Sequence, residues 1–175
     1  VLSRDTGFRR SYGSNPYGGY DRVDNPPFLF RGDTDGRLAP KERVVAVTIG
    51  DADAAFPFSI LEKERAVNYM VGDQDVVVFF KAGTTSALDR RSIRDSQDIG
   101  ATGVFDPRVD DRKLTFRAEG DTIVDNETGS VWNIFGEATE GPLNGESLTR
   151  LVHGDHFWFA WGAFKPDTKI YQGIG

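Results

Sequence analysis

The segment Asp75–Lys81 reads DVVVFFK and carries the strongest structural signal in the sequence. Its five central residues are all apolar, and all are β-branched or aromatic. Such a run predicts a strand buried on both faces, because a strand with one wet face alternates apolar with polar residues. We therefore expect this segment to lie in the interior of the domain.

Hairpin signals lie on both sides of this strand. Residues 43–49 read RVVAVTI and end at Gly50-Asp51, which predicts a turn into a second strand. Further along the chain, residues 121–125 and 130–135 are separated by the turn sequence NETG, which predicts another hairpin. Strands of this length, joined by frequent turns, favour a β-rich barrel or sandwich.

Two short helices complete the predicted elements. Ser59 is placed to cap a helix over residues 60–68, and Asp155 or Gly154 is placed to cap a second helix over residues 156–164. We thus expect a mainly β fold with one or two short helices, in the α+β class. It forms a single compact barrel- or sandwich-like domain.

Residues 1–40 differ from the remainder of the chain. They are rich in Gly, Pro, Asp, Arg and Tyr and show little periodicity, whereas residues 41–175 carry the strand and helix signals. We expect an extended, irregular N-terminal arm packed on a single β-rich domain, because its aromatic side chains bury large areas. The alternative is an ordered arm that contacts a protein partner or a second copy of the chain.

Composition narrows the function classes. The 175 residues include 13 Phe, 5 Tyr and 3 Trp, enough aromatic side chains for a real core. The net charge of -6 disfavours nucleic acid as a partner. With no Cys in the chain, disulfides, thiolate catalysis and Cys-ligated metals are excluded.

No apolar run reaches the ~20 residues that a membrane span requires. Because the chain starts at Val1, we expect an exported product whose signal was removed.

The two histidines, His153 and His156, flank Asp155 and form one candidate site. Two imidazoles and a carboxylate can hold zinc or copper, and a His is the first choice for a catalytic base. The competing interpretation is structural: Asp155 caps the predicted helix and each His ring packs against its neighbours. We prefer the structural interpretation, because a metal site needs at least three ligands and capping is a common use of Asp.

Hydroxyl groups follow the buried strand and form a second candidate site. Thr84, Thr85 and Ser86 come directly after Gly83, so Thr84 or Ser86 is a conceivable nucleophile on a tight turn. However, the surrounding residues do not form the Gly-x-Ser-x-Gly elbow of hydrolases. Hydroxyls at strand ends usually bond the backbone, and we favour that role here.

Several longer segments, in order along the chain, resemble one known family. They read RLAPKERVVAV (residues 37–47), FPFSILEKERAVN (56–68), VVVFFKAGTTSALD (76–89), DNETGSVWN (125–133), GEATEGPLNG (136–145) and FKPDT (164–168). This order is similar to the domain-of-unknown-function 3179 family, and GTTSALD with HGDHFWFAW is most similar to its haloarchaeal branch. The resemblance implies an extracytoplasmic protein, exported or lipid-anchored, for which the family assigns no activity.

Departures from the family pattern also bear on function. Many members carry a Cys-x-x-Cys pair before the Gly-Thr and a His-Glu pair in the helix after the Pro, which together would suit a soft metal. Here Lys81-Ala82 replaces the first pair, and Glu64 and Arg65 occupy the second. The resemblance therefore does not transfer a metal or redox function to this chain.

The sequence thus favours a non-catalytic extracytoplasmic module of unknown ligand, with a binding or structural role and possible self-assembly through the N-terminal arm. No cofactor is expected. The alternative is a metal-binding protein or a hydrolase-like enzyme centred on His153, Asp155 and His156.

Overall fold

The computed structural model describes residues 7, 20, 22–23, 25–27, 30–84 and 99–174. Much of the predicted N-terminal arm therefore lies outside the described residues, as does the candidate nucleophile Ser86. No helix in the described ranges is long and apolar enough to cross a lipid bilayer.

Three four-stranded sheets and one short ribbon make up the fold. The first sheet has the order β13 (His153–Phe157), β1 (Arg43–Ile49), β2 (Ala52–Pro57), β14 (Lys169–Ile170). The central sheet has the order β12 (Thr149–Arg150), β5 (Ala101–Asp106), β4 (Gln74–Lys81), β3 (Ala66–Val71). The third sheet has the order β11 (Ala138–Glu140), β10 (Val131–Trp132), β9 (Thr122–Asp125), β8 (Phe116–Glu119). The ribbon pairs β6 (Arg108–Val109) with β7 (Arg112–Lys113).

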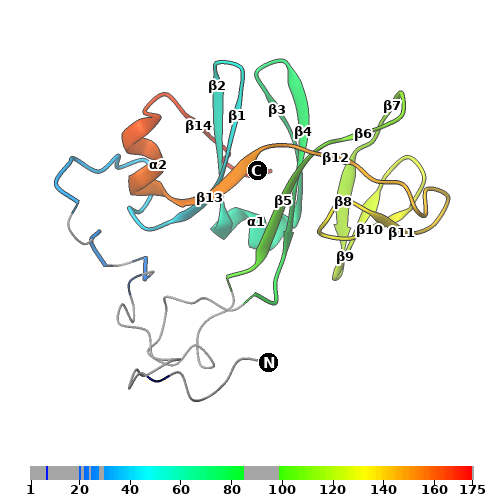
Figure 1. Ribbon diagram of the computed structural model, residues 1–175, viewed down its shortest axis with the longest axis horizontal. Coiled ribbons are helices and arrows are strands. Elements are labelled where there is room, and N and C mark those ends of the chain that lie inside the picture. The colour runs from blue at the N-terminus through cyan, green and yellow to red at the C-terminus, as the bar shows by residue number, and fades with distance from the viewer. Residues whose placement is uncertain are drawn as a thin grey trace.

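Strand β4 lies between two hydrophobic cores. Val76, Val78 and Phe80 pack with the first sheet, whereas Val77 and Phe79 pack with the third. This division follows from the alternation of side chains along a strand. The prediction that residues 75–81 are buried on both faces is confirmed, and Figure 1 shows the sheets following one another across the molecule. The arrangement is a sandwich of sheets and not a closed barrel.

Two short helices close the sandwich. Helix α1 (Phe58–Glu64) inserts Phe58 and Leu61 into the core between the first and central sheets. Helix α2 (Trp158–Phe164) covers the outer face of the first sheet, where Trp158 is fully buried. The mainly β fold class with two short helices is thus confirmed, as are the two predicted hairpins, β1–β2 and β9–β10.

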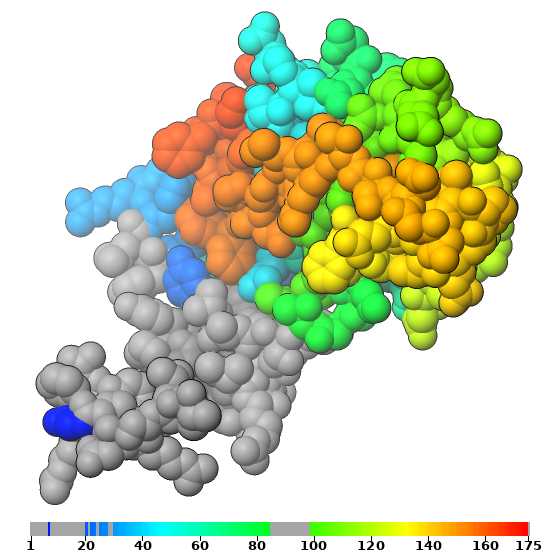
Figure 2. All heavy atoms as spheres, turned by 45° about the vertical axis from the view of Figure 1, so that its right-hand side comes forward, coloured from blue at the N-terminus to red at the C-terminus, as the bar shows by residue number. Residues whose placement is uncertain are grey.

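The segment from β12 to β13 joins two layers. Strand β12 pairs with β5 of the central sheet, and β13 pairs with β1 of the first sheet. Figure 2 shows this segment, in orange, crossing one face of the molecule from the yellow third sheet to the red-orange α2. Both histidines lie in β13, at the first-sheet end of this segment.

The predicted start of the second helix is wrong. Residues 153–157 form β13, paired over its length with β1, and the helix begins only at Trp158. Its first turn needs no side-chain cap, because the carbonyl of Glu42 accepts the Trp158 N–H at 2.8 Å. Asp155 therefore has no capping role, and its carboxylate accepts a hydrogen bond from Thr102 Oγ1 at 2.8 Å instead.

The predicted first helix is both displaced and too long. Helix α1 starts at Phe58, and the N–H of Ser59 donates to Glu42 Oε1, so Ser59 is not the cap. The helix ends at Arg65, whose φ of 58° is left-handed and turns the chain into β3. The sequence predicted that the helix would continue to residue 68. Beyond Arg65, however, the chain forms β3, because pairing with β4 outweighs the local preference for helix.

The described end of the N-terminal arm packs against α2. The indole Nε1 of Trp158 donates to the carbonyl of Asp35 at 2.9 Å. Arg37 places its guanidinium over the Trp158 ring and donates to the carbonyls of Pro166 and Thr168. A hydrogen bond from Arg37 and, secondarily, its charge outweigh burial and lower the pKa of the Asp35 carboxyl.

Candidate functional site

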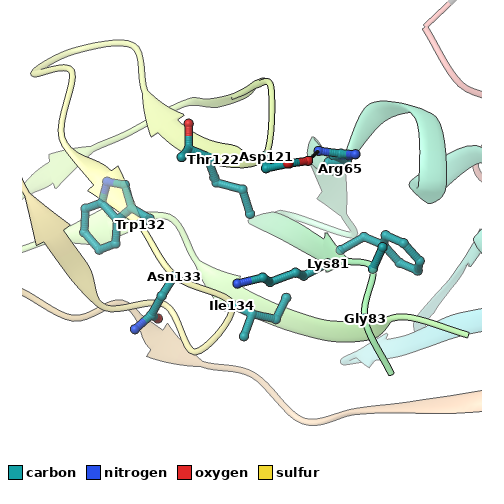
Figure 3. Close-up of a pocket in the computed structure, with 11 residues that line it drawn as sticks. Arg65, Lys81, Gly83, Asp121, Thr122, Trp132, Asn133 and Ile134 are labelled. Carbon is teal, nitrogen blue, oxygen red and sulfur yellow. Dashed lines mark hydrogen bonds and ion pairs between the residues drawn. The ribbon is translucent and has the colours of Figure 1, made fainter. Parts of the chain in front are cut away.

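A cavity of about 420 Å³ opens where the end of β4 approaches the third sheet, beside Gly83. Its size lies within the range of sites for small ligands. The wall is formed by apolar residues of the central and third sheets, and the charged residues at the cavity come from three separate elements (Figure 3). The lining joins core residues of two sheets to Lys81, a cation with no partner in the described ranges, so we take this cavity as the candidate site.

The apolar wall is rigid. Ile123 and Trp132 face each other across the β9–β10 pair, and both are buried. The Trp132 ring packs edge-on against Phe116 at 5.6 Å between ring centroids. Ile134, which is partly buried, extends this wall. Because these side chains also belong to cores, the cavity keeps its shape without a ligand.

Asp125 fixes the position of Trp132. Its Oδ2 accepts hydrogen bonds from the Trp132 indole Nε1 and from the Ser130 N–H, each at 3.0 Å. Its Oδ1 accepts a further bond from the Thr128 N–H at 2.6 Å. Burial alone raises the pKa of the Asp125 carboxyl, but the hydrogen bonds from Trp132, Thr128 and Ser130 outweigh it and lower the pKa.

Lys81 is the last residue of β4, and its side chain alternates with the inward-facing Phe80. It is exposed, and its ammonium group forms no hydrogen bond or ion pair within the described ranges. Figure 3 shows the Lys81 side chain extending into the cavity toward Ile134. Lys81 therefore presents a free cation to whatever enters the cavity.

Arg65 is held in place by its backbone. Its N–H donates to the carbonyl of Leu61, and its own carbonyl accepts the Phe80 N–H, both at 2.8 Å. Its Nη1 pairs with Asp121 Oδ1 at 2.7 Å and also donates to the Gly120 carbonyl. The Nε–Nη2 edge of the guanidinium has no hydrogen-bond acceptor in the described part of the chain.

The charged residues at the cavity are thus two cations, Arg65 and Lys81, and one carboxylate, Asp121. Their net charge is positive in a chain whose overall charge is -6. The local sign is therefore opposite to that of the whole protein, which favours an anionic ligand at this place.

The structure does not bring the predicted metal ligands together. In β13, His153 and Asp155 point to one face of the first sheet and His156 points to the other, as the strand period dictates. His153 Nδ1 bonds the Leu151 carbonyl at 2.8 Å, and the His156 ring stacks on Trp161 at 5.2 Å. Within the described residues, no group of three or more His, Asp or Glu side chains is placed to hold a metal ion.

The predicted hydroxyl site is only partly described. Thr84 follows Gly83 at the cavity, and its carbonyl accepts the Ile99 N–H at 2.6 Å. Ser86 lies outside the described residues, as does Thr85. Neither His153 nor His156 lines the cavity. His153 bonds the Leu151 carbonyl, and the His156 ring stacks on Trp161.

Sequence reasoning did not single out Arg65, Lys81 or Asp121 as ligand-binding residues. The structure gathers Lys81, Ala82 and Arg65 at one cavity, and these are positions that the sequence analysis had named as differing from the pattern implied by the resemblance. Glu64 turns away and accepts hydrogen bonds from the Tyr171 hydroxyl at 2.7 Å and the Ile174 N–H at 2.8 Å. Two cations at the cavity repel a metal ion, so these residues do not fit one.

Comparison with known proteins gives one match. A family model described as "Protein of unknown function (DUF3179)" matches residues 1–168. Neither the curated proteins nor the solved structures contain a match to the chain.

Proposed function

The chain belongs to the DUF3179 family, and from this premise we propose that it is a non-catalytic binding module that works outside the cytoplasm. Its ligand site is the cavity beside Gly83. The observation that carries this proposal is the free ammonium group of Lys81 over a preformed apolar wall. Binding sites for small molecules commonly combine such a wall with a few polar groups that fix orientation.

The polar groups around the cavity support binding and not bond-making. Thr122 Oγ1 donates to the Glu119 carbonyl at 2.7 Å, so this hydroxyl is already engaged. The Asn133 amide is likewise engaged, because it donates to Glu137 at 2.8 Å. Asp121 is paired with Arg65. No described residue of the cavity wall is a nucleophile with an adjacent base, which covalent or general-base catalysis would need.

The proposed location rests on the sequence resemblance, since relatives of this kind are exported or lipid-anchored. The absence of Cys is compatible with that setting but does not require it. Self-association through residues 1–40 stays a prediction, and light scattering at increasing protein concentration tests it. The alternative centred on His153, Asp155 and His156 gains no support from side chains that point to opposite faces of a sheet.

The proposal is tested by a ligand screen read by protein NMR. Anionic, cationic and neutral small molecules are added to isotope-labelled protein, and we expect binders to shift the amide signals of residues 81–83 and 132–134. Lys81→Gln weakens the binding of those compounds. Lys63→Gln is the matched control, because Lys63 is exposed on the nearby helix α1 and lies outside the cavity. If every compound that binds shifts only amide signals outside residues 81–83 and 132–134, the proposal is overturned.

A further inference from the structure

Resting on this proposed function, we infer that the ligand of the cavity is a monoanion: one carboxylate attached to an apolar group. Three features of the site select this chemistry: the sum of its charges, the free edge of Arg65 and the apolar wall. Arg65 contributes to the first two features, and the apolar wall is independent of it.

The charges favour a single negative charge. Arg65 and Lys81 supply two positive charges, and Asp121 supplies one negative charge at the cavity rim. A monocarboxylate balances the sum. A dianion such as phosphate would carry excess charge close to Asp121, and like charges at such a distance repel. The site therefore discriminates by charge number as well as by sign.

The free edge of Arg65 matches the shape of a carboxylate. Because Nη1 is occupied by Asp121 and Gly120, the Nε–Nη2 edge is the part of the guanidinium left for a ligand. That edge can donate two parallel hydrogen bonds to the two oxygens of one carboxylate. Lys81 adds a third donor, which has no fixed direction and adapts to ligands of different length.

The wall favours an apolar body on the ligand. Ile123 and Ile134 offer no hydrogen-bonding side chains, so a fully hydrated ligand would lose water there without replacement. Burying apolar surface is favourable instead, and each buried methylene strengthens binding about fourfold. An inorganic anion gains nothing from this part of the cavity.

The test compares acetate, butyrate and hexanoate with inorganic phosphate and with butylammonium, all titrated into the full chain. We expect affinity to rise about fourfold per methylene along the carboxylates until the cavity is filled. Phosphate binds more weakly than butyrate, and butylammonium does not bind at the cavity. Lys81→Gln weakens butyrate binding about tenfold, whereas Lys63→Gln leaves it unchanged.

Asp121→Asn gives a second readout that does not depend on Lys81. Removing this carboxylate raises the positive charge of the site, so phosphate gains more affinity than butyrate. Phosphate that binds the wild-type cavity more tightly than every carboxylate overturns the inference but leaves the cavity as a ligand site. Compounds that shift no amide signal of residues 81–83 or 132–134 overturn both the inference and the proposed function.

Discussion

The indole Nε1 of Trp132 donates a hydrogen bond to Asp125 Oδ2 at 3.0 Å, and both residues are buried. This bond holds the Trp132 side chain of β10 against the end of β9. Trp132 is part of the wall of the candidate cavity, and Asp125 is the acceptor that holds it. The turn sequence between them thus has a role beyond reversing the chain.

Asp125→Ala is expected to destabilise the fold by about 3 kcal/mol. The substitution leaves the buried Trp132 indole N–H without its acceptor, and it leaves the Ser130 N–H only the longer bond to Thr128 Oγ1 at 3.3 Å. Urea unfolding measures the change. Asp111→Ala, at an exposed turn, is the control and is expected to stay within about 0.5 kcal/mol of wild type. An Asp125→Ala protein as stable as this control would show that the buried carboxylate is dispensable.

Acid sensitivity follows from the same carboxyl. Its pKa is lowered in the folded state relative to its ordinary value of 3.8, so the unfolded chain binds the proton more readily. The stabilisation is therefore present above the ordinary pKa and is lost as the pH falls through the folded pKa. Unfolding free energies measured between pH 6 and pH 2 should decline below about pH 4. Asp125→Asn should make that decline shallower. An unchanged decline of the unfolding free energy with pH would show that the Asp125 carboxyl does not cause it.

Asn68 joins the central sheet to the third sheet. Its Nδ2 donates to the Phe116 carbonyl at 2.7 Å, and its Oδ1 accepts the Phe116 N–H at 2.8 Å. Asn68→Ala leaves both backbone groups of a buried residue unpaired and is expected to cost about 2–3 kcal/mol. Asn68→Asp restores the acceptor but not the donor, so it should also be less stable than wild type. Equal melting temperatures of Asn68→Ala and the wild type would contradict this prediction.

Much of the fold was predictable because it follows from local pattern. The run in residues 75–81 indicated burial on both faces, and the structure places one core on each side of β4. Turn residues located the two hairpins correctly. Both helices were found, but neither was bounded correctly. Glu42 takes the place of the caps that the sequence suggested: its side-chain Oε1 accepts the Ser59 N–H of α1, and its backbone carbonyl accepts the Trp158 N–H of α2.

The candidate site was less predictable for a physical reason. Arg65, Lys81 and Asp121 are ordinary surface residues in the sequence, and only the packing of α1, β4 and the β8–β9 hairpin places them around one cavity. The histidines were predicted as a site because imidazole binds metals and can act as a base. The sequence analysis predicted a helix starting at His156, but residues 153–157 form a strand. The alternation of side chains along that strand places His153 and His156 on opposite faces.

Backbone strain at Arg65 can be measured separately from its charge. A residue with a φ of 58° is strained unless it is Gly, and the cost is about 1 kcal/mol. Both Arg65→Gly and Arg65→Ala lose the exposed ion pair with Asp121, which contributes about 0–1 kcal/mol. Arg65→Gly should therefore be about 1 kcal/mol more stable than Arg65→Ala in urea unfolding. Equal stability of the two variants would show that the backbone carries no strain there.

The most direct test of the cavity as the ligand site is an NMR titration of the labelled chain with butyrate. The amide signals of residues 81–83 and 132–134 should shift together along one saturable curve, and those of His153–His156 should stay in place. Shifts confined to His153–His156, with the cavity amides unmoved, would contradict the account.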